Sequence, residues 1–298
     1  MTTVSPRSAR LTFRALEPIH GMIYFTPHGP EMYRDLGLTD PRMMYFASRS
    51  AAFGPVAADV TVAAFFNFNP AAVRVALPAA WEIASPAAIL RARLLAVDRS
   101  LRQAWNGDIA DADVREAAGL ARRAAERARE RPQGRALFAA HAALPWPDEP
   151  HLVLWHAQTL LREYRGDGHV ALLATEGLDG IEALITHSAT GEVAAEVLRL
   201  GRSWSEQDWA SGVDRLRARG WLANGALALS EHGAARRRAI EDRTDELTVY
   251  PYEAIGEDGC ARLRALASSL AVRVIEGDLG FPSVLSERYR QAIQAESR

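Results

Sequence analysis

The pattern of apolar and polar positions predicts a mainly α-helical protein. In residues 86–104 apolar side chains recur at helical spacing, with Ser85 suited to the cap and Pro86 to the first turn. Residues 111–130, rich in Ala, Arg and Glu, predict an amphipathic helix whose charges form its solvated face. Both segments are long enough for helices that pack into a core.

A change of composition predicts the domain organisation. Residues 131–150 are rich in Pro, Gly and small side chains, which is typical of a boundary. We therefore expect a helical ligand-pocket domain over 1–145 and a second helical domain over 146–298. The second should open with a helix that breaks at Arg-Gly-Asp-Gly, residues 165–168, because glycine favours turns.

The second domain has the element order helix, turn, helix, hairpin, long helix. The run Ser203-Trp-Ser-Glu206 has the capping-box pattern of a helix start. Asn224-Gly225 lies between two short apolar segments, which indicates a tight hairpin turn. Ser230 then caps the long helix. This layout predicts a winged helix with a short β-hairpin as its wing.

Two resemblances support this layout. Leu216-Arg-Ala-Arg-Gly220-Trp-Leu and Leu229-Ser-Glu-His-Gly233 resemble the regulators of the multiple-antibiotic-resistance (MarR) type, over about seventy residues. Almost the whole chain resembles an uncharacterised actinobacterial helix-turn-helix-type family. The second resemblance implies a helical protein ending in a winged helix, and it names no substrate.

The motifs that carry the wider resemblance lie along the whole chain. They are His20-x-x-x-Tyr24-Phe25, Tyr45-Phe46-x-x-Arg49, Phe66-x-Phe68-x-Pro70, Leu154-Trp-His156, Leu161-Arg-Glu-x-Arg165-Gly-Asp-Gly-His169 and Trp204-Ser-Glu-x-x-Trp209. The chain departs from the family at Ser50-Ala-Ala-Phe53-Gly54, where Ala-Pro-Leu-Gly is frequent. A ligand choice that depended on this turn would differ here.

Composition narrows the classes of partner. The net charge of −2 gives no overall basic field to attract nucleic acid or an anionic membrane. The single cysteine, Cys260, excludes an internal disulfide and a multi-cysteine metal site. No segment has the apolar run of a signal peptide or membrane span, so we expect a cytoplasmic protein without a membrane partner. No cofactor could be assigned, and a homodimer stays open.

The first turn of the predicted DNA-recognition helix is acidic. It carries Glu206 and Asp208, with Asp214 further on, and carboxylates repel DNA phosphates. DNA binding is therefore open but disfavoured.

Polar groups set among aromatic side chains indicate a ligand pocket. An apolar lining with few orienting polar groups is typical of a small-molecule site. The polar candidates are His20, Tyr24, Tyr45, Arg49 and Asn67, and the aromatic ones are Phe46, Phe53 and Phe66. Acid–base chemistry, if any occurs, would fall to His20 or His156 with a tyrosine such as Tyr24.

The segment around residue 163 allows two interpretations. His156 and Glu163 share one helix face, and His169 could fold back over the turn, which would give a two-histidine, one-carboxylate metal site. The alternative is a structural corner in which Arg162 and its neighbours neutralise one another, with His169 bordering a ligand. We favour the corner and assign no metal ligand.

These observations support three functional hypotheses. The first is a binding protein for an apolar or aromatic metabolite, in specialised metabolism or self-protection, whose winged helix does not read DNA. The second is a MarR-like, ligand-responsive regulator. The third is a biosynthetic enzyme with His/Tyr acid–base chemistry or a His/Glu metal site.

Overall fold

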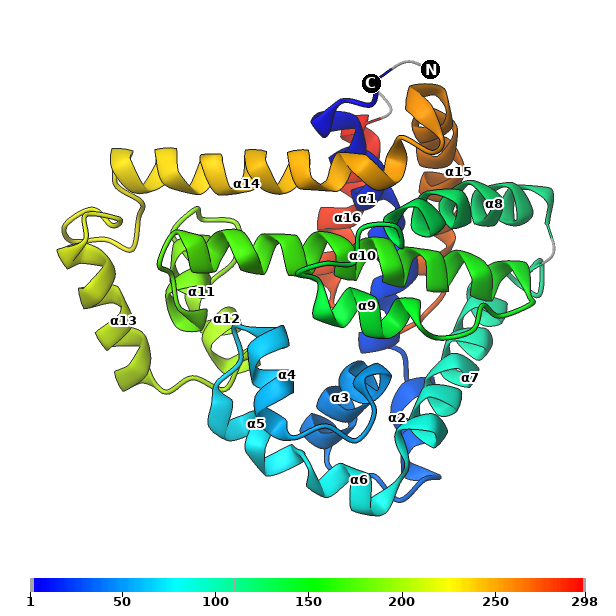
Figure 1. Cartoon of the computed structure of the whole chain (residues 1–298), viewed down its shortest axis with the longest axis horizontal. Helices are drawn as coiled ribbons and strands as arrows, with labels where there is room; N and C mark the ends of the chain where they lie inside the picture. The colour runs from blue at the N-terminus through cyan, green and yellow to red at the C-terminus, as the bar shows by residue number, and fades with distance from the viewer. Residues whose placement is uncertain (1–2, 110, 297–298) are drawn as a thin grey trace.

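The computed structural model describes residues 3–109 and 111–296, and these residues form helices without any β-strand. The expectation of a mainly helical protein is confirmed (Figure 1). The N-terminal elements are α1 (Pro6–Gly21), η1 (Met22–Tyr24), α2 (His28–Arg34), α3 (Pro41–Ser50), η2 (Ala51–Phe53), α4 (Ala58–Phe65), α5 (Pro70–Ala76), α6 (Ala79–Ile83), α7 (Pro86–Ala104), α8 (Ala112–Ala128) and α9 (Ala136–Ala142). The later ones are α10 (Pro150–Thr175), α11 (Gly180–Ser188), α12 (Ala195–Gly201), α13 (Glu206–Ala218), α14 (Glu231–Tyr252), α15 (Gly256–Glu276) and α16 (Ser283–Glu296).

Helix α10 runs through the middle of the molecule and contacts α1, α8, α9 and α14 (Figure 1). The predicted break at residues 165–168 is wrong, because α10 continues through it. Asp167 accepts the backbone N–H of Phe138 at 2.9 Å, at the start of α9, and Gly168 lies against Leu247 of α14. Tertiary packing thus outweighs the roughly 1 kcal/mol that a helical glycine costs relative to alanine.

Two hydrophobic clusters share α10. The first takes in α1 to α9, α10 as far as Tyr164, and α15. The second begins at Leu172 near the end of α10 and includes the buried faces of α11 and α13 and Ile240 of α14. The domain boundary between residues 145 and 146 stays a prediction. The two hydrophobic clusters do not divide at this boundary, because most of α10 belongs to the first cluster together with the helices before residue 146.

The helices α11, α12 and α13, where the sequence predicts a helix-turn-helix, lie at one side of the molecule (Figure 1). We call these three helices the helix-turn-helix unit. The capping box of α13 is formed by Ser205 and Asp208, two residues after the predicted start. Helix α14 begins after Ser230, whose side chain accepts the Gly233 N–H as expected.

The predicted β-hairpin wing is not formed by strands. In the described chain the segment between α13 and α14 has only an isolated antiparallel bridge, Leu222 with Leu229. The segment turns at Gly225, which has a φ of 91°. Its alanines and glycine offer few of the large or β-branched cross-strand pairs that stabilise a sheet.

No single described helix is long and apolar enough to cross a membrane, although α5 to α6 and α7 pass that test together as a bent pair. The apolar side chains of α7 that would face lipid include Ile89, Val97 and Leu101, and all three are buried in the first cluster.

The helix-turn-helix unit rests on the turn between α4 and α5. Phe66, with a positive φ of 56°, ends α4 and packs against the second cluster. Its carbonyl oxygen lies where a Cβ of Gly180 would be. Asn67 accepts the indole N–H of Trp204 at 2.9 Å, and Asn69 donates its N–H to the Arg202 carbonyl at 3.0 Å.

We predict that Gly180→Ala lowers the free energy of unfolding by about 2 kcal/mol, because the added methyl overlaps the Phe66 carbonyl at a packed contact. Gly201→Ala, with nothing near its Cβ position, is the matched control and should be neutral or slightly stabilising. Denaturant unfolding of both variants checks this. Equal stability of the two would show that the contact is not tight.

Candidate functional site

A group of polar side chains lies inside the first hydrophobic cluster, where α1, α3, α7 and α10 meet. We call this group the central polar cluster. It consists of His20, Tyr24, Tyr45, Arg49, Arg93, Arg162 and Glu163.

Glu163 is the anionic centre of the cluster. Its side chain is 7% exposed, and its Oε1 lies 3.1 Å from Arg162 and 3.6 Å from Arg49. Arg162 also donates to Glu17 on α1 at 3.1 Å, which leaves the second oxygen of Glu17 without a partner among the described residues. Burial raises the pKa of Glu163, but Arg49 and Arg162 outweigh it, so the pKa lies below its usual range. Glu163 is therefore ionised.

His20 lies at the end of α1 with no solvent exposure. Its ring stacks on Trp155 of α10, with 5.4 Å between centroids, and lies 5.7 Å from the ring of Tyr24. Neither ring nitrogen of His20 has a hydrogen-bond partner in the described structure, and neither does the buried hydroxyl of Tyr24. Burial, with added repulsion from Arg162 and Arg93, lowers the pKa of His20 far below 6.5. His20 is thus neutral, with one N–H to donate.

Arg93 comes from α7 and is 3% exposed. Its guanidinium carbon lies 5.4 Å from the Trp155 ring centroid and 5.8 Å from that of Tyr24. One Nη donates to the Ser48 carbonyl at 2.7 Å, whereas Nε is buried without a partner in the described residues. No described carboxylate oxygen lies within 4.0 Å of a guanidinium nitrogen of Arg93, so Arg93 forms no ion pair with these residues. A buried, unpaired guanidinium is costly and calls for an explanation.

Tyr45 and Arg49 form the edge of the cluster that faces the aromatic side chains. Arg49 donates to the Tyr45 hydroxyl at 3.0 Å and lies 4.2 Å over the ring of Phe65. Phe46 contacts the rings of Tyr45 and Phe68. Burial raises the pKa of Tyr45, but the charges of Arg49 and Arg202 outweigh this effect and lower it below 10.

Arg202, at the end of α12, brings a further guanidinium from the helix-turn-helix unit to this edge. It lies 4.6 Å over the ring of Phe68, and its Nε is buried with no partner in the part of the chain described. Burial lowers the pKa of Arg202, and the charge of Arg49 adds to this effect. The ion pairs of the described chain do not include Arg202.

The structure brings together six of the residues selected from the sequence: His20, Tyr24, Tyr45, Phe46, Arg49 and Arg162. Phe53 in η2 packs on the first hydrophobic cluster, and Phe66 and Asn67 lie in the turn that carries the helix-turn-helix unit. Their roles in ligand binding stay predictions.

His156, Glu163 and His169 do not converge. His156 packs edge-on against Trp146 at 4.8 Å, whereas His169 is hydrogen-bonded to Thr244 of α14 at 2.9 Å. The described residues contain no group of three His, Cys, Asp or Glu side chains that could hold a metal. The predicted alternative of a metal site at these residues is wrong, because the uninterrupted helix points the three side chains at different neighbours.

Four residues were not selected from the sequence: Arg93, Trp155, Arg202 and His141. His141 is buried, and burial is the main cause that lowers its pKa to about 3. A signal for Arg93 was present, because it shares the apolar face of residues 86–104 with Ile89 and Val97. An arginine at such a position is unusual. Trp155 belongs to the motif Leu154-Trp-His156, but the sequence does not distinguish it from a core tryptophan on a buried helix.

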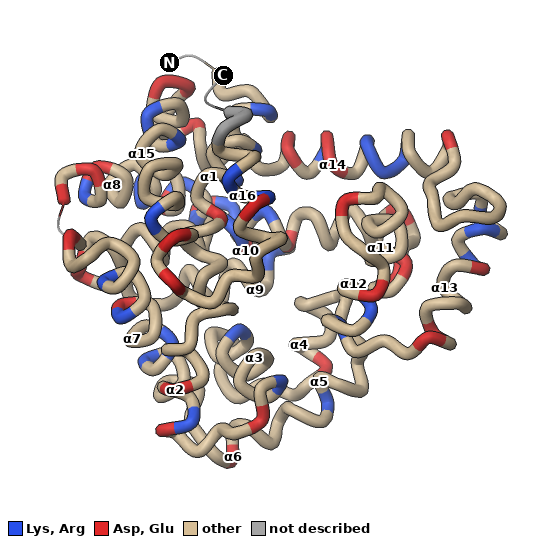
Figure 2. Tube along the Cα trace, turned by 180° about the vertical axis from the view of Figure 1, so that it is seen from behind, with Lys and Arg blue, Asp and Glu red and all other residues tan. Residues whose placement is uncertain are grey.

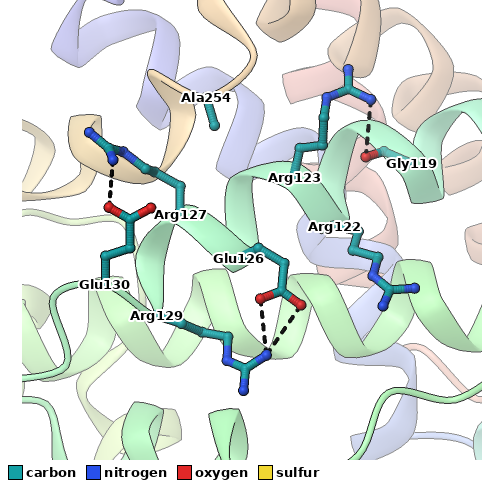
Figure 3. A pocket seen from close by; sticks show the side chains of 8 residues that line it. All are labelled: Gly119, Arg122, Arg123, Glu126, Arg127, Arg129, Glu130 and Ala254. Atoms are coloured by element: carbon teal, nitrogen blue, oxygen red, sulfur yellow. Dashed lines mark hydrogen bonds and ion pairs between the residues drawn. The ribbon is translucent and has the colours of Figure 1, made fainter.

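An open groove of about 820 Å³ lies elsewhere, over α8 (Figure 3). Two of its arginines, Arg127 and Arg129, bond to Glu130 and Glu126 of the same surface. A smaller hollow of about 350 Å³ lies beside the α4–α5 turn and includes Asn69. The lining of the α8 groove holds four arginines and two glutamates, and it contains none of the central polar cluster.

The outer face of the helix-turn-helix unit is not basic. Acidic and basic positions both mark α13 (Figure 2). The side chains of Glu206 and Asp214 are 88% and 78% exposed. Arg215 and Arg219 instead bond to the buried Glu182 of α11, at 3.0 and 2.9 Å.

Comparison with known proteins places the chain in a family. Residues 9–280 match the model of a family described as a helix-turn-helix family, and the chain belongs to it. No curated protein and no solved structure matches the chain. The family description names a helix-turn-helix and specifies no ligand.

We predict that buried histidines make the fold sensitive to acid. Burial lowers the pKa of His156 to about 4, below the unfolded value of about 6.5. The difference between these two pKa values contributes to the free energy of unfolding, and this contribution is fully present above pH 6.5. It decreases as the pH falls toward 4, by at most about 3 kcal/mol in total. His156→Phe should remove this part of the slope in denaturant unfolding at pH 7, 6 and 5.

The exposed His232 provides a control for this experiment. His232→Gln should keep the slope of the wild-type protein. An unchanged slope in His156→Phe would show that the ring at position 156 is protonated without cost, and hence that it is hydrated.

Proposed function

We propose that this helix-turn-helix protein binds a small organic molecule at the central polar cluster. The observation that carries the proposal is the meeting of three buried groups whose polar atoms have no partner among the described residues: the His20 ring, the Tyr24 hydroxyl and the Arg93 Nε. Buried polar atoms are almost always hydrogen-bonded in folded proteins, and leaving one unpaired costs about 1–3 kcal/mol.

The surroundings of these groups support a ligand with an apolar or aromatic part. The rings of Trp155, Tyr24 and Tyr45 lie around the polar atoms, and this combination of apolar rings with a few polar groups is typical of small-molecule sites. Perturbed pKa values, such as the lowered pKa of His20, also concentrate at functional sites.

We predict that Tyr24→Phe weakens ligand binding by about 2- to 10-fold, because it removes only the hydroxyl that would bond the ligand. Calorimetric titration with a panel of aromatic acids, alcohols and amides measures this. Tyr250→Phe, which removes the hydroxyl of a surface tyrosine, is the matched control. The proposal fails if no member of the panel binds, or if Tyr24→Phe and His20→Ala bind as tightly as the wild-type protein.

A DNA-binding regulator is the second candidate, because membership in a helix-turn-helix family favours it. A regulator would present α13 to the major groove. The charges oppose this use. Glu206 and Asp214 are exposed and pair with Arg199 and Arg217, while Arg215 and Arg219 are held by the buried Glu182. We therefore infer that DNA reading is not the principal function of the unit.

We predict that the protein does not bind the DNA upstream of its own gene at about 50 mM salt, where contacts to phosphates are strong. Fluorescence anisotropy with this duplex tests the point. Tight binding that weakens steeply with salt would establish the regulator instead. A variant combining Glu206→Gln with Asp214→Asn would then show whether α13 is the contact, because removing two repulsive charges there should strengthen binding.

A further inference from the structure

We propose that the ligand of the central polar cluster is an organic anion, whose oxyanion group is bound by Arg93 together with Tyr24 and His20. This inference rests on the proposed binding function and names the chemical class of the ligand. The class is a carboxylate or phosphate attached to an apolar or aromatic body.

The balance of charge is the first argument. Arg49 and Arg162 are paired with Glu163 and Glu17, so the two positive charges meet two negative ones. Arg93 forms no ion pair with a described carboxylate, and it acts on Glu163 only from a longer range than Arg49 and Arg162 do. Burying an uncompensated ion costs several kcal/mol, and a bound anion would remove that cost.

Arg202 adds to the excess of positive charge at the other edge of the cluster. It too has no carboxylate partner in the described structure, and it lies beside Tyr45 and Phe68. The charge of Arg202 contributes to the lowered pKa of Tyr45. Arg93 contacts Tyr24 and Trp155 instead.

The balance of donors and acceptors is the second argument. The unpartnered atoms around Arg93 are its Nε–H, the Tyr24 hydroxyl and the ring nitrogens of neutral His20. Together they can donate three hydrogen bonds, whereas His20 and Tyr24 supply the only unsatisfied acceptors among these three side chains. An ionised carboxylate or phosphate accepts hydrogen bonds and donates none, so it can satisfy these three donors, although not the acceptor nitrogen of His20.

The walls of the site indicate the rest of the ligand. Trp155 stacks on His20 with only 6° between the ring planes, and its face also meets the Arg93 guanidinium. Tyr24 and Tyr45 lie close by, with 5.8 Å between their ring centroids. An aromatic body attached to the anion would therefore lie among aromatic side chains, which a free inorganic ion would not use.

The test compares ligands of equal shape and different charge on the full chain. We expect benzoate and phenyl phosphate to raise the melting temperature, and benzamide to bind at least about 10-fold more weakly than benzoate at the same ionic strength. Inorganic phosphate is included to separate recognition of the ion from recognition of the aromatic body. This comparison uses the wild-type protein and does not depend on the folding of a variant.

Variants then assign the anion to Arg93. Arg93→Gln should weaken benzoate binding about 10- to 100-fold, as expected for loss of a charge-assisted bond. Arg93→Lys should recover part of it. Arg99→Gln, at a half-exposed position on the same helix, is the control and should bind as the wild type does.

The outcomes separate this inference from the proposed function. Equal binding of benzamide and benzoate would overturn the anion and leave a small-molecule site. Unchanged benzoate binding in folded Arg93→Gln would overturn the role of Arg93. Stabilisation by inorganic phosphate alone would contradict an organic ligand, and a complete lack of binding by acids and neutral molecules would remove both proposals.

Discussion

The carboxylate of Glu163 is the interaction on which the interior of this protein depends. It lies on the central helix α10 and receives Arg49 from α3 and Arg162 from its own helix. Arg162 extends the network to Glu17 of α1. Breaking a buried pair by removing one partner costs about 3–5 kcal/mol, because an uncompensated charge remains. The network therefore fixes α1, α3 and α10 relative to one another, and this arrangement determines where His20, Tyr24 and Arg93 meet.

The same helix carries the geometry of the interior to the helix-turn-helix unit. Near its C-terminal end, α10 supplies Leu172 and Leu173 to the second hydrophobic cluster. The turn between α4 and α5 forms a second connection, where Phe68 lies under Arg202 and Asn67 accepts from Trp204. Tyr45 of the central polar cluster also contacts Phe68, with 5.4 Å between ring centroids. This turn therefore contacts both the helix-turn-helix unit and the central polar cluster.

Much of the fold could be predicted from the sequence, because periodicity and caps are local signals. Helix α7 begins and ends where its apolar period does, and Ser230 caps α14 as its side chain predicts. The continuity of α10 could not be predicted, since it depends on Asp167 bonding to the start of α9 and Gly168 fitting against α14. The wing was overestimated, because Asn-Gly predicts a turn but does not supply the side chains that make strands.

Some residues of the candidate site could be predicted from the sequence, whereas Arg93 could not be selected from its residue type alone. The aromatic and histidine motifs correctly suggested that His20, Tyr24 and Arg49 would lie together, since they are polar groups in apolar segments. Arg93 was overlooked because a chain whose basic residues are all arginines makes each one less informative. Its position on the apolar face of α7 was the better guide, because a buried charge requires compensation whichever basic residue carries it.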